Sequence, residues 1–129
     1  MKTLHDLLGG FSVDQATHDD LVRRTAFALR KAGYTDVCAD VSEYVTPQRV
    51  YWQRTGDGHV PDVTAGSFII EVETADSMGS EHTRSQCALF SQFARERRLT
   101  FAVVVPAGCK SQMDWQLVLW SITATVWEF

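Results

Sequence analysis

The sequence lacks paired cysteines. Its 129 residues include three cysteines, at Cys38, Cys87 and Cys109, which are odd in number and far apart. No Cys-x-x-Cys pair occurs, so the sequence predicts neither a zinc knuckle nor a thiol redox motif. We interpret each cysteine as a small buried apolar residue.

Long hydrophobic runs are also missing. No segment approaches the roughly 18 consecutive apolar residues of a membrane-spanning helix. The stretch from Met1 to Gly10 lacks the charged-then-apolar pattern of a secretory signal. Internal repeats, low-complexity tracts and linkers do not occur. We therefore expect a single domain over residues 1–129, with a cytoplasmic location and no membrane partner.

The sequence also has no excess of positive charge. The chain has 12 Lys and Arg against 16 Asp and Glu, which gives a net charge of −4. A domain that binds nucleic acid tightly by itself is usually basic, so this balance argues against that class. It does not exclude a nuclease, because a bound cation changes the local charge and a partner can supply affinity.

The hydrophobic periodicity predicts an α/β fold. Apolar stripes of helical period predict helices over about residues 13–32, 80–98 and 111–120. Apolar runs and turn signals predict strands over 37–45, 50–52, 59–63, 68–73, 101–105 and 123–127. The middle strands predict a β-meander, and the strand–helix–strand order of 68–105 predicts a right-handed parallel crossover. The expected architecture is a mixed sheet flanked by helices.

Three acids stand out in the middle of the chain. Asp62 follows Pro61, and Glu71 and Glu73 end the apolar run that begins at Phe68. Because strand side chains alternate between faces, Glu71 and Glu73 leave the same face. Charged residues at strand ends often simply reach solvent, but buried carboxylates need a partner. No Lys or Arg is adjacent in sequence, so these acids predict a site for a hard divalent cation, Mg²⁺ or Mn²⁺.

The pair Pro61-Asp62, followed by Glu71-Val72-Glu73, resembles the motif of the PD-(D/E)XK nuclease superfamily, which has the restriction-endonuclease-like fold. The expected order of helix, three strands, helix and strand over residues 13–105 resembles the core of that family. The resemblance implies that Asp62 and Glu71 hold the metal and that the chain hydrolyses phosphodiester bonds of nucleic acid.

The chain departs from the family at Glu73, which stands where the family usually has a lysine. Some restriction endonucleases carry Glu-x-Glu and are active, whereas in other members loss of the lysine goes with loss of activity. Glu73 would then act as a general base or help to bind a second ion.

Other residues are weaker candidates. Gln86 resembles the helix glutamine of the exonuclease branch, where an aromatic follows four residues later, here Phe90; the alternative is an amide that hydrogen-bonds the sheet edge. Asp19 or Asp20 stands where the superfamily often has an acid in the first helix, although helix N-termini favour acids in any case. The role of Glu43 is left open.

The alternative function is a non-catalytic interaction domain on a nuclease-like scaffold, which the acidic charge and Glu73 favour. Tyr51 and Trp52, beside a glycine turn, would then form a partner surface or dimer edge. A third interpretation is that the three acids line a solvated crevice. Because the basic patches are weak, we expect a homodimer or a partner subunit to help hold nucleic acid. We interpret His59 and His82 as surface or turn histidines and not as metal ligands. Arg84 is a candidate phosphate contact, although its spacing does not require that role.

Overall fold

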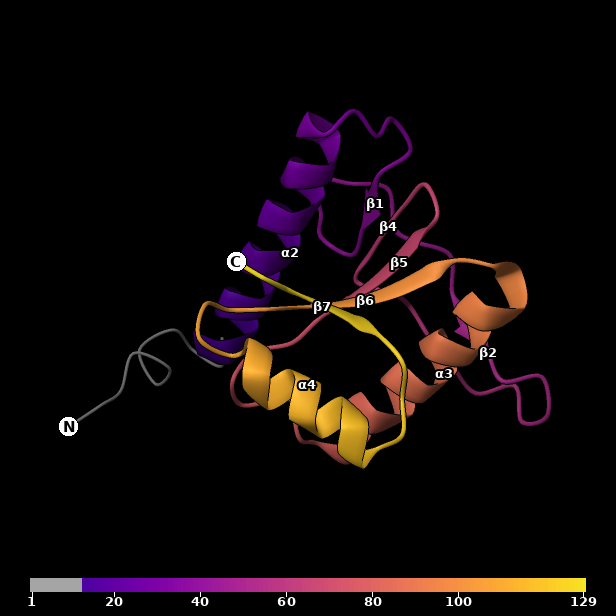
Figure 1. Ribbon diagram of the computed structural model, residues 1–129. Helices are drawn as coiled ribbons and strands as arrows, with labels where there is room; N and C mark the ends of the chain where they lie inside the picture. The colour runs from indigo at the N-terminus through magenta and orange to yellow at the C-terminus, as the bar shows by residue number, and fades with distance from the viewer. Residues whose placement is uncertain (1–12) are drawn as a thin grey trace.

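The computed structural model describes residues 13–129, which form three helices and seven strands (Figure 1). The elements are α2 (Val13–Lys31), β1 (Cys38–Ala39), β2 (Val50–Tyr51), β3 (Gly58–His59), β4 (Val63–Ala65), β5 (Phe68–Val72), α3 (Glu81–Arg97), β6 (Thr100–Val105), α4 (Lys110–Leu119) and β7 (Thr125–Glu128). The predicted helices and the two C-terminal strands thus occur close to their expected positions. Ser12, which has the sequence pattern of a helix cap, lies outside the described residues.

The main sheet has five strands in the order β1-β4-β5-β6-β7. The β1–β4 and β4–β5 pairs are antiparallel, whereas β5–β6 and β6–β7 are parallel. In the central register, Ile70 lies between Val63 of β4 and Ala102 of β6. This mixed sheet confirms the α/β class, and the parallel β5–β6 pair is the one predicted from the strand–helix–strand order.

Helices cover both faces of this sheet (Figure 1). Ile70 and Val72 of β5 pack in a cluster with Val22 of α2, while Ile69, on the opposite face, packs in a cluster with Phe90 of α3. Strand β6 is buried from residue 101 to 105 because it lies between β5 and β7 and is covered on both sides. The continuous apolar runs in the sequence therefore mark the two central strands.

Local capping fixes the ends of α3. Ser80 precedes the helix, and its Oγ accepts a hydrogen bond from the Thr83 backbone N–H at 3.1 Å. The helix ends at Arg98, whose φ of 57° is left-handed and whose N–H bonds the carbonyl of Ala94. The cap at Ser80 fixes the first turn of α3, and Thr83 in that turn lies beside the end of β5, where it contacts Glu73.

The meander differs from the prediction. The expected strand 37–45 is reduced to β1, and the expected strand 59–63 is divided in two. Strand β3 pairs with β2 in a separate two-stranded ribbon, and only β4 joins the main sheet. The division falls at Pro61, which has no backbone N–H to donate to a neighbouring strand. The antiparallel part of the sheet is therefore made by β1, β4 and β5.

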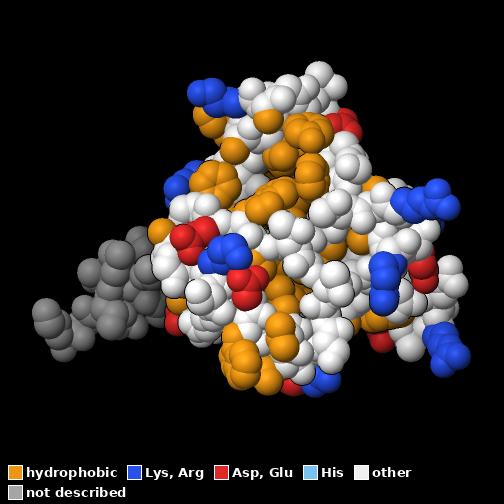
Figure 2. All heavy atoms as spheres, in the orientation of Figure 1, with side chains coloured by type: hydrophobic (Ala, Val, Ile, Leu, Met, Phe, Trp, Pro, Cys, Tyr) orange, Lys and Arg blue, Asp and Glu red, His pale blue; other side chains and the backbone are white. Residues whose placement is uncertain are grey.

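The surface contains an apolar patch over α4 (Figure 2). It is formed by Trp115, Val118 and Leu119, of which Trp115 is 63% exposed. Of the cysteines, Cys87 is buried as expected, but Cys38 and Cys109 are only partly buried. No helix in residues 13–129 is both long enough and apolar enough to span a membrane.

Candidate carboxylate site

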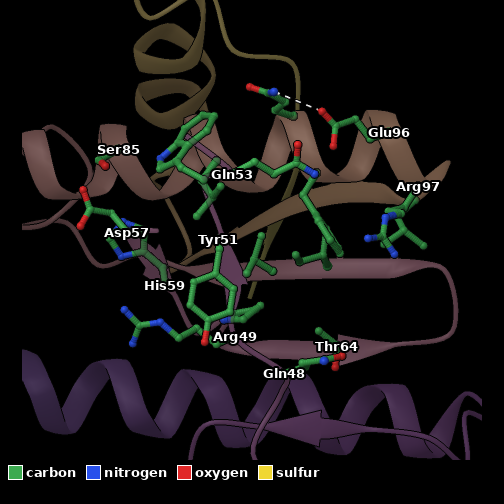
Figure 3. Close-up of a pocket in the computed structure, with 18 of the residues that line it drawn as sticks. Gln48, Arg49, Tyr51, Gln53, Asp57, His59, Thr64, Ser85, Glu96 and Arg97 are labelled. Carbon is green, nitrogen blue, oxygen red and sulfur yellow. Dashed lines mark hydrogen bonds between the residues drawn. The ribbon is translucent and has the colours of Figure 1, made fainter. Parts of the chain in front are cut away.

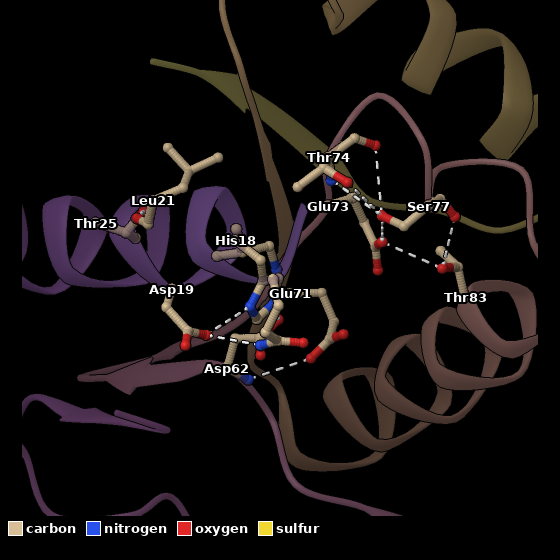
Figure 4. A network of polar contacts seen from close by, with 12 residues as sticks. His18, Asp19, Leu21, Thr25, Asp62, Glu71, Glu73, Thr74, Ser77 and Thr83 are labelled. Atoms are coloured by element: carbon tan, nitrogen blue, oxygen red, sulfur yellow. Dashed lines mark hydrogen bonds and ion pairs between the residues drawn. The ribbon is translucent and has the colours of Figure 1, made fainter. Parts of the chain in front are cut away.

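The three predicted acids lie close together at one end of the main sheet (Figure 4). Asp62 immediately precedes β4, Glu71 lies in β5 and Glu73 immediately follows β5. Their exposed fractions are 8%, 1% and 4%, respectively. The antiparallel β4–β5 pair, with its tight turn at residues 66 and 67, brings Asp62 next to the two glutamates.

Hydrogen bonds tie Asp62 to β5. The backbone N–H of Asp62 donates to Oε1 of Glu71 at 3.2 Å, and the N–H of Val72 donates to Oδ2 of Asp62 at 2.8 Å. The carbonyl of Asp62 accepts from the N–H of Asp40 at 2.8 Å. Each carboxylate in this pair is therefore held by the backbone of the other strand.

Glu73 is held by hydroxyl groups instead. The Ser77 hydroxyl donates a short hydrogen bond to Oε2 of Glu73, and Oγ1 of Thr83 lies 3.1 Å from the same oxygen. Thr83 is in the first turn of α3 and is itself fixed by Ser80, whose hydroxyl lies 2.9 Å from it. Figure 4 shows Ser77 and Thr83 converging on Glu73. The orientation of Glu73 thus depends on the loop after β5 and on the start of α3.

His18 of α2 is the basic partner of the site. Its Nε2 lies 3.3 Å from Oδ2 of Asp62, and its Nδ1 lies 3.1 Å from Oδ1 of Asp19. Burial lowers the pKa of His18, but hydrogen bonds and charge from Asp62 and Asp19 outweigh it and raise the pKa to about 9. His18 is therefore an imidazolium at neutral pH.

The sequence motifs did not point to His18. The available signal was its spacing, since His18 stands three and four residues before Leu21 and Val22, which are buried on α2. A histidine that continues the buried stripe of a helix faces the sheet rather than solvent. The partner that it meets there, Asp62, is set by the tertiary fold.

Negative charge at the site exceeds the positive charge beside it. Burial, followed by the charges of Asp62 and Glu73, raises the pKa of Glu71 well above its ordinary value. Burial also raises the pKa of Glu73 to about 7, although hydrogen bonds from Ser77 and Thr83 oppose this shift. Within residues 13–129, the only ion pair made by these three acids is that of Asp62 with His18. The raised pKa values thus come first from burial, and repulsion from the neighbouring acids adds to them.

Comparison with protein-family models, with curated proteins and with solved structures finds no match. No group of three or more His, Cys, Asp or Glu side chains in the described part of the chain has the arrangement of a metal centre. The carboxylates adjoin one another but are turned toward separate hydrogen-bond partners. The chemistry of the site is therefore the evidence for the function of this protein.

The other predicted site residue, Gln86, is half-buried on α3 one turn after Thr83. No hydrogen bond joins its side chain to Asp62, Glu71 or Glu73 in residues 13–129. Its role in the site stays a prediction.

The two candidate acids on the first helix, Asp19 and Asp20, have different surroundings. Asp19 contacts His18 and accepts a hydrogen bond from Gln15 at 2.9 Å, whereas Asp20 is exposed. Asp19 therefore reaches the site only through His18. Glu43 lies apart, in a surface ion pair with Arg23.

The remaining candidates do not contact the three acids. The rings of His59 and His82 lie 5.4 Å apart, centre to centre. Arg84 is exposed and pairs with Glu81 at 3.7 Å. His82 is exposed, and His59 is partly buried beside Phe90. A phosphate contact of Arg84 stays a prediction.

Proposed function

We propose that this protein is a metal-dependent nuclease of the PD-(D/E)XK type, which hydrolyses phosphodiester bonds of nucleic acid with Mg²⁺ or Mn²⁺. The observation that carries the proposal is the group of three buried carboxyl groups, of which, within residues 13–129, only Asp62 has a basic partner, His18. A buried charge of this kind is costly unless something pairs with it. A divalent cation is the partner that this donor set suits.

The chemistry of the donors fits such an ion. Mg²⁺ and Mn²⁺ prefer carboxylate oxygens, and Asp62, Glu71 and Glu73 supply them. Two like charges about 4 Å apart repel by roughly 4 kcal/mol at an effective dielectric constant of about 20. A bound cation attracts each carboxylate and outweighs that repulsion, so Asp62 and Glu71 would hold it with Glu73 as the third carboxylate.

The arrangement of the elements supports the restriction-endonuclease-like fold as the finer description. An antiparallel β1-β4-β5 unit follows α2, and then α3 leads to the parallel strand β6. This is the helix, three strands, helix and strand order that the sequence resemblance implies. The acids of the motif lie where β4 and β5 meet α3.

A bound ion would supply Lewis acidity, which lowers the pKa of water and stabilises charge on the phosphate. Glu73 would accept a proton from the attacking water as the general base. The water oxygen bonds to phosphorus, the P–O bond to the leaving oxygen breaks, and solvent protonates that oxygen. Ser77 and Thr83 orient Glu73 for this transfer.

His18 and the backbone position Asp62. The imidazolium and the N–H of Val72 both contact Oδ2, and Oδ1 would bind the ion. His18 also places a positive charge at a site where position 73 offers no lysine. We therefore regard His18 as a positioning residue.

Calorimetry of Mn²⁺ and Mg²⁺ binding tests the proposal. We expect stoichiometric binding by the wild type, and its loss in Asp62→Asn and in Glu71→Gln. Asp114→Asn is the matched control, because Asp114 pairs with Lys110 on the surface of α4. A cleavage screen with single-stranded, duplex and branched substrates follows for the variants that bind metal.

Absence of binding at millimolar metal in a folded sample, with and without added oligonucleotide, would contradict the proposal. It would favour a non-catalytic interaction scaffold. Equal binding by the wild type and both site variants would place the metal elsewhere. A homodimer or partner subunit stays a prediction, which light scattering over a range of concentrations tests.

A further inference from the structure

A wide groove lies between the β2–β3 ribbon and α3 (Figure 3). We call it the ribbon groove; its volume is about 1160 Å³. Pockets for small molecules usually have about 300–1,000 Å³ and enclose their ligand. The ribbon groove is larger and open, so it suits an extended polymer better than a small metabolite.

Both walls of the ribbon groove carry an arginine over an aromatic ring. On the ribbon, the guanidinium of Arg49 lies 5.5 Å from the ring centre of Tyr51, which is 57% exposed. On α3, the guanidinium of Arg97 lies 5.1 Å from the ring centre of Phe93. These pairs combine a cation with a flat apolar surface.

The arginines of the groove are not neutralised by ion pairs. In the described part of the chain, Arg49, Arg54 and Arg97 form none, and Arg49 instead donates to the carbonyl of Gly58 at 2.9 Å. Two acids, Asp57 and Glu96, also line the groove. The groove therefore carries a small positive excess, although the whole chain has a net charge of −4.

The ribbon groove leads toward the carboxylate site. Pro61 lines it and immediately precedes Asp62. Ile69 also lines it and lies two residues before Glu71, on the same face of β5. On the opposite wall, α3 lines the groove from Ser85 to Arg97 and contacts the site through Thr83, two residues before Ser85. None of the three acids lines the groove, and its end at Pro61 and Ser85 is the end next to the site in sequence.

We propose that the ribbon groove binds single-stranded nucleic acid and directs it to the carboxylate site. Proteins bind single strands by arginines that follow the phosphates and by aromatic rings on which bases stack. The bases of a duplex are already stacked and paired, so they cannot offer their faces to Tyr51. This inference deepens the proposed nuclease function and rests on it for the fate of the strand.

Fluorescence anisotropy with a labelled oligothymidine of about ten nucleotides, at low salt and with EDTA, tests the binding. We expect the wild type to bind and Tyr51→Leu to weaken binding by about fivefold or more, because base stacking is lost. Tyr51→Phe keeps the ring and should bind as the wild type does.

Arginine variants test the electrostatic part. Arg97→Ala should lower the affinity and reduce the slope of log K against log salt by about 0.7. Arg95→Ala is the matched control, because it removes the same charge from the same helix but does not line the groove. Thermal melting of each variant checks that it is folded under the conditions of the binding experiment.

Three results would overturn the inference: no binding by the wild type, equal binding by Tyr51→Leu and wild type, or equally tight binding of a duplex of the same length. Asp62→Asn should keep oligothymidine binding in EDTA, and Tyr51→Leu should keep Mn²⁺ binding. Failure of the metal site and failure of the groove are therefore seen in separate experiments.

Discussion

At the residue scale, position 73 determines how the site responds to pH. Glu73 is buried, and it is held by two hydroxyl groups and not by a cation. Its pKa of about 7 means that the folded protein binds a proton that the unfolded chain releases near its ordinary pKa of 4.5. The contribution to stability is therefore present below pH 4.5 and is lost as the pH rises through about 7.

Glu73→Gln tests this linkage in metal-free protein. We expect the wild type to lose stability between pH 4.5 and 7, and the variant to lose less, because the amide does not titrate. Urea denaturation in EDTA at several pH values measures the difference. Glu71 contributes in the same direction, so part of the slope remains in the variant. If the stability of the two proteins changed with pH in the same way, the raised pKa of Glu73 would be contradicted.

His18 gives the second residue-scale prediction. Its pKa is raised to about 9 from 6.5, so its stabilising charge is fully present below pH 6.5 and is lost as the pH rises through 9. His18→Gln should therefore be less stable than the wild type at pH 6. The difference in free energy of unfolding between the two proteins should be smaller at pH 9.5, and chemical denaturation at the two pH values measures it. A gap that stays constant would mean that His18 acts only by packing.

At the element scale, α3 connects the core to the carboxylate site and to the ribbon groove. Thr83 contacts Glu73, the middle of the helix packs on the sheet through Phe90, and the C-terminal half lines the ribbon groove. A shift of this helix would move the site and the groove together. Its stability depends on apolar burial, because Phe90 is fully buried.

Phe90→Ala should destabilise the protein by about 3–5 kcal/mol, because it leaves a cavity under α3. Phe27→Ala is the matched control, since Phe27 of α2 is largely exposed and should change the stability by only about 0.5 kcal/mol. Chemical denaturation monitored by circular dichroism measures both values. Similar effects of the two substitutions would contradict this account of the core.

At the scale of the whole molecule, the site joins parts of the chain that are distant in sequence. His18 comes from α2, Asp62 from the start of β4 and Thr83 from α3. A cation bound at this junction would stabilise the folded state alone, because the unfolded chain does not keep the carboxylates together. Metal binding should therefore appear as global stabilisation.

Mn²⁺ should raise the melting temperature more at pH 8 than at pH 5, because protons compete for Glu71 and Glu73 at low pH. At 100 times the dissociation constant, the stabilisation should be about 2.7 kcal/mol. Differential scanning calorimetry of the wild type and Glu71→Gln measures it. A shift of equal size in Glu71→Gln would indicate nonspecific metal binding.

Much of the element order was predictable from local patterns. The buried runs at residues 68–72 and 101–105 predicted the two central strands, and the stripe around Phe90 predicted α3. The strands and the turn of the β2–β3 ribbon were predictable as well, but its separation from the main sheet was not. Its residues are as strand-like as those of β4, and only the pairing shows that they leave the main sheet.

The sequence by itself determined where the three helices and the central strands form and which faces they bury, because side-chain periodicity is a property of a local segment. It also placed Glu71 and Glu73 on one face of β5. Only the tertiary structure brought His18 to Asp62, turned the hydroxyl groups of Ser77 and Thr83 toward Glu73, and opened the ribbon groove beside α3. These contacts join residues from separate elements, and their geometry depends on how the sheet and helices pack together.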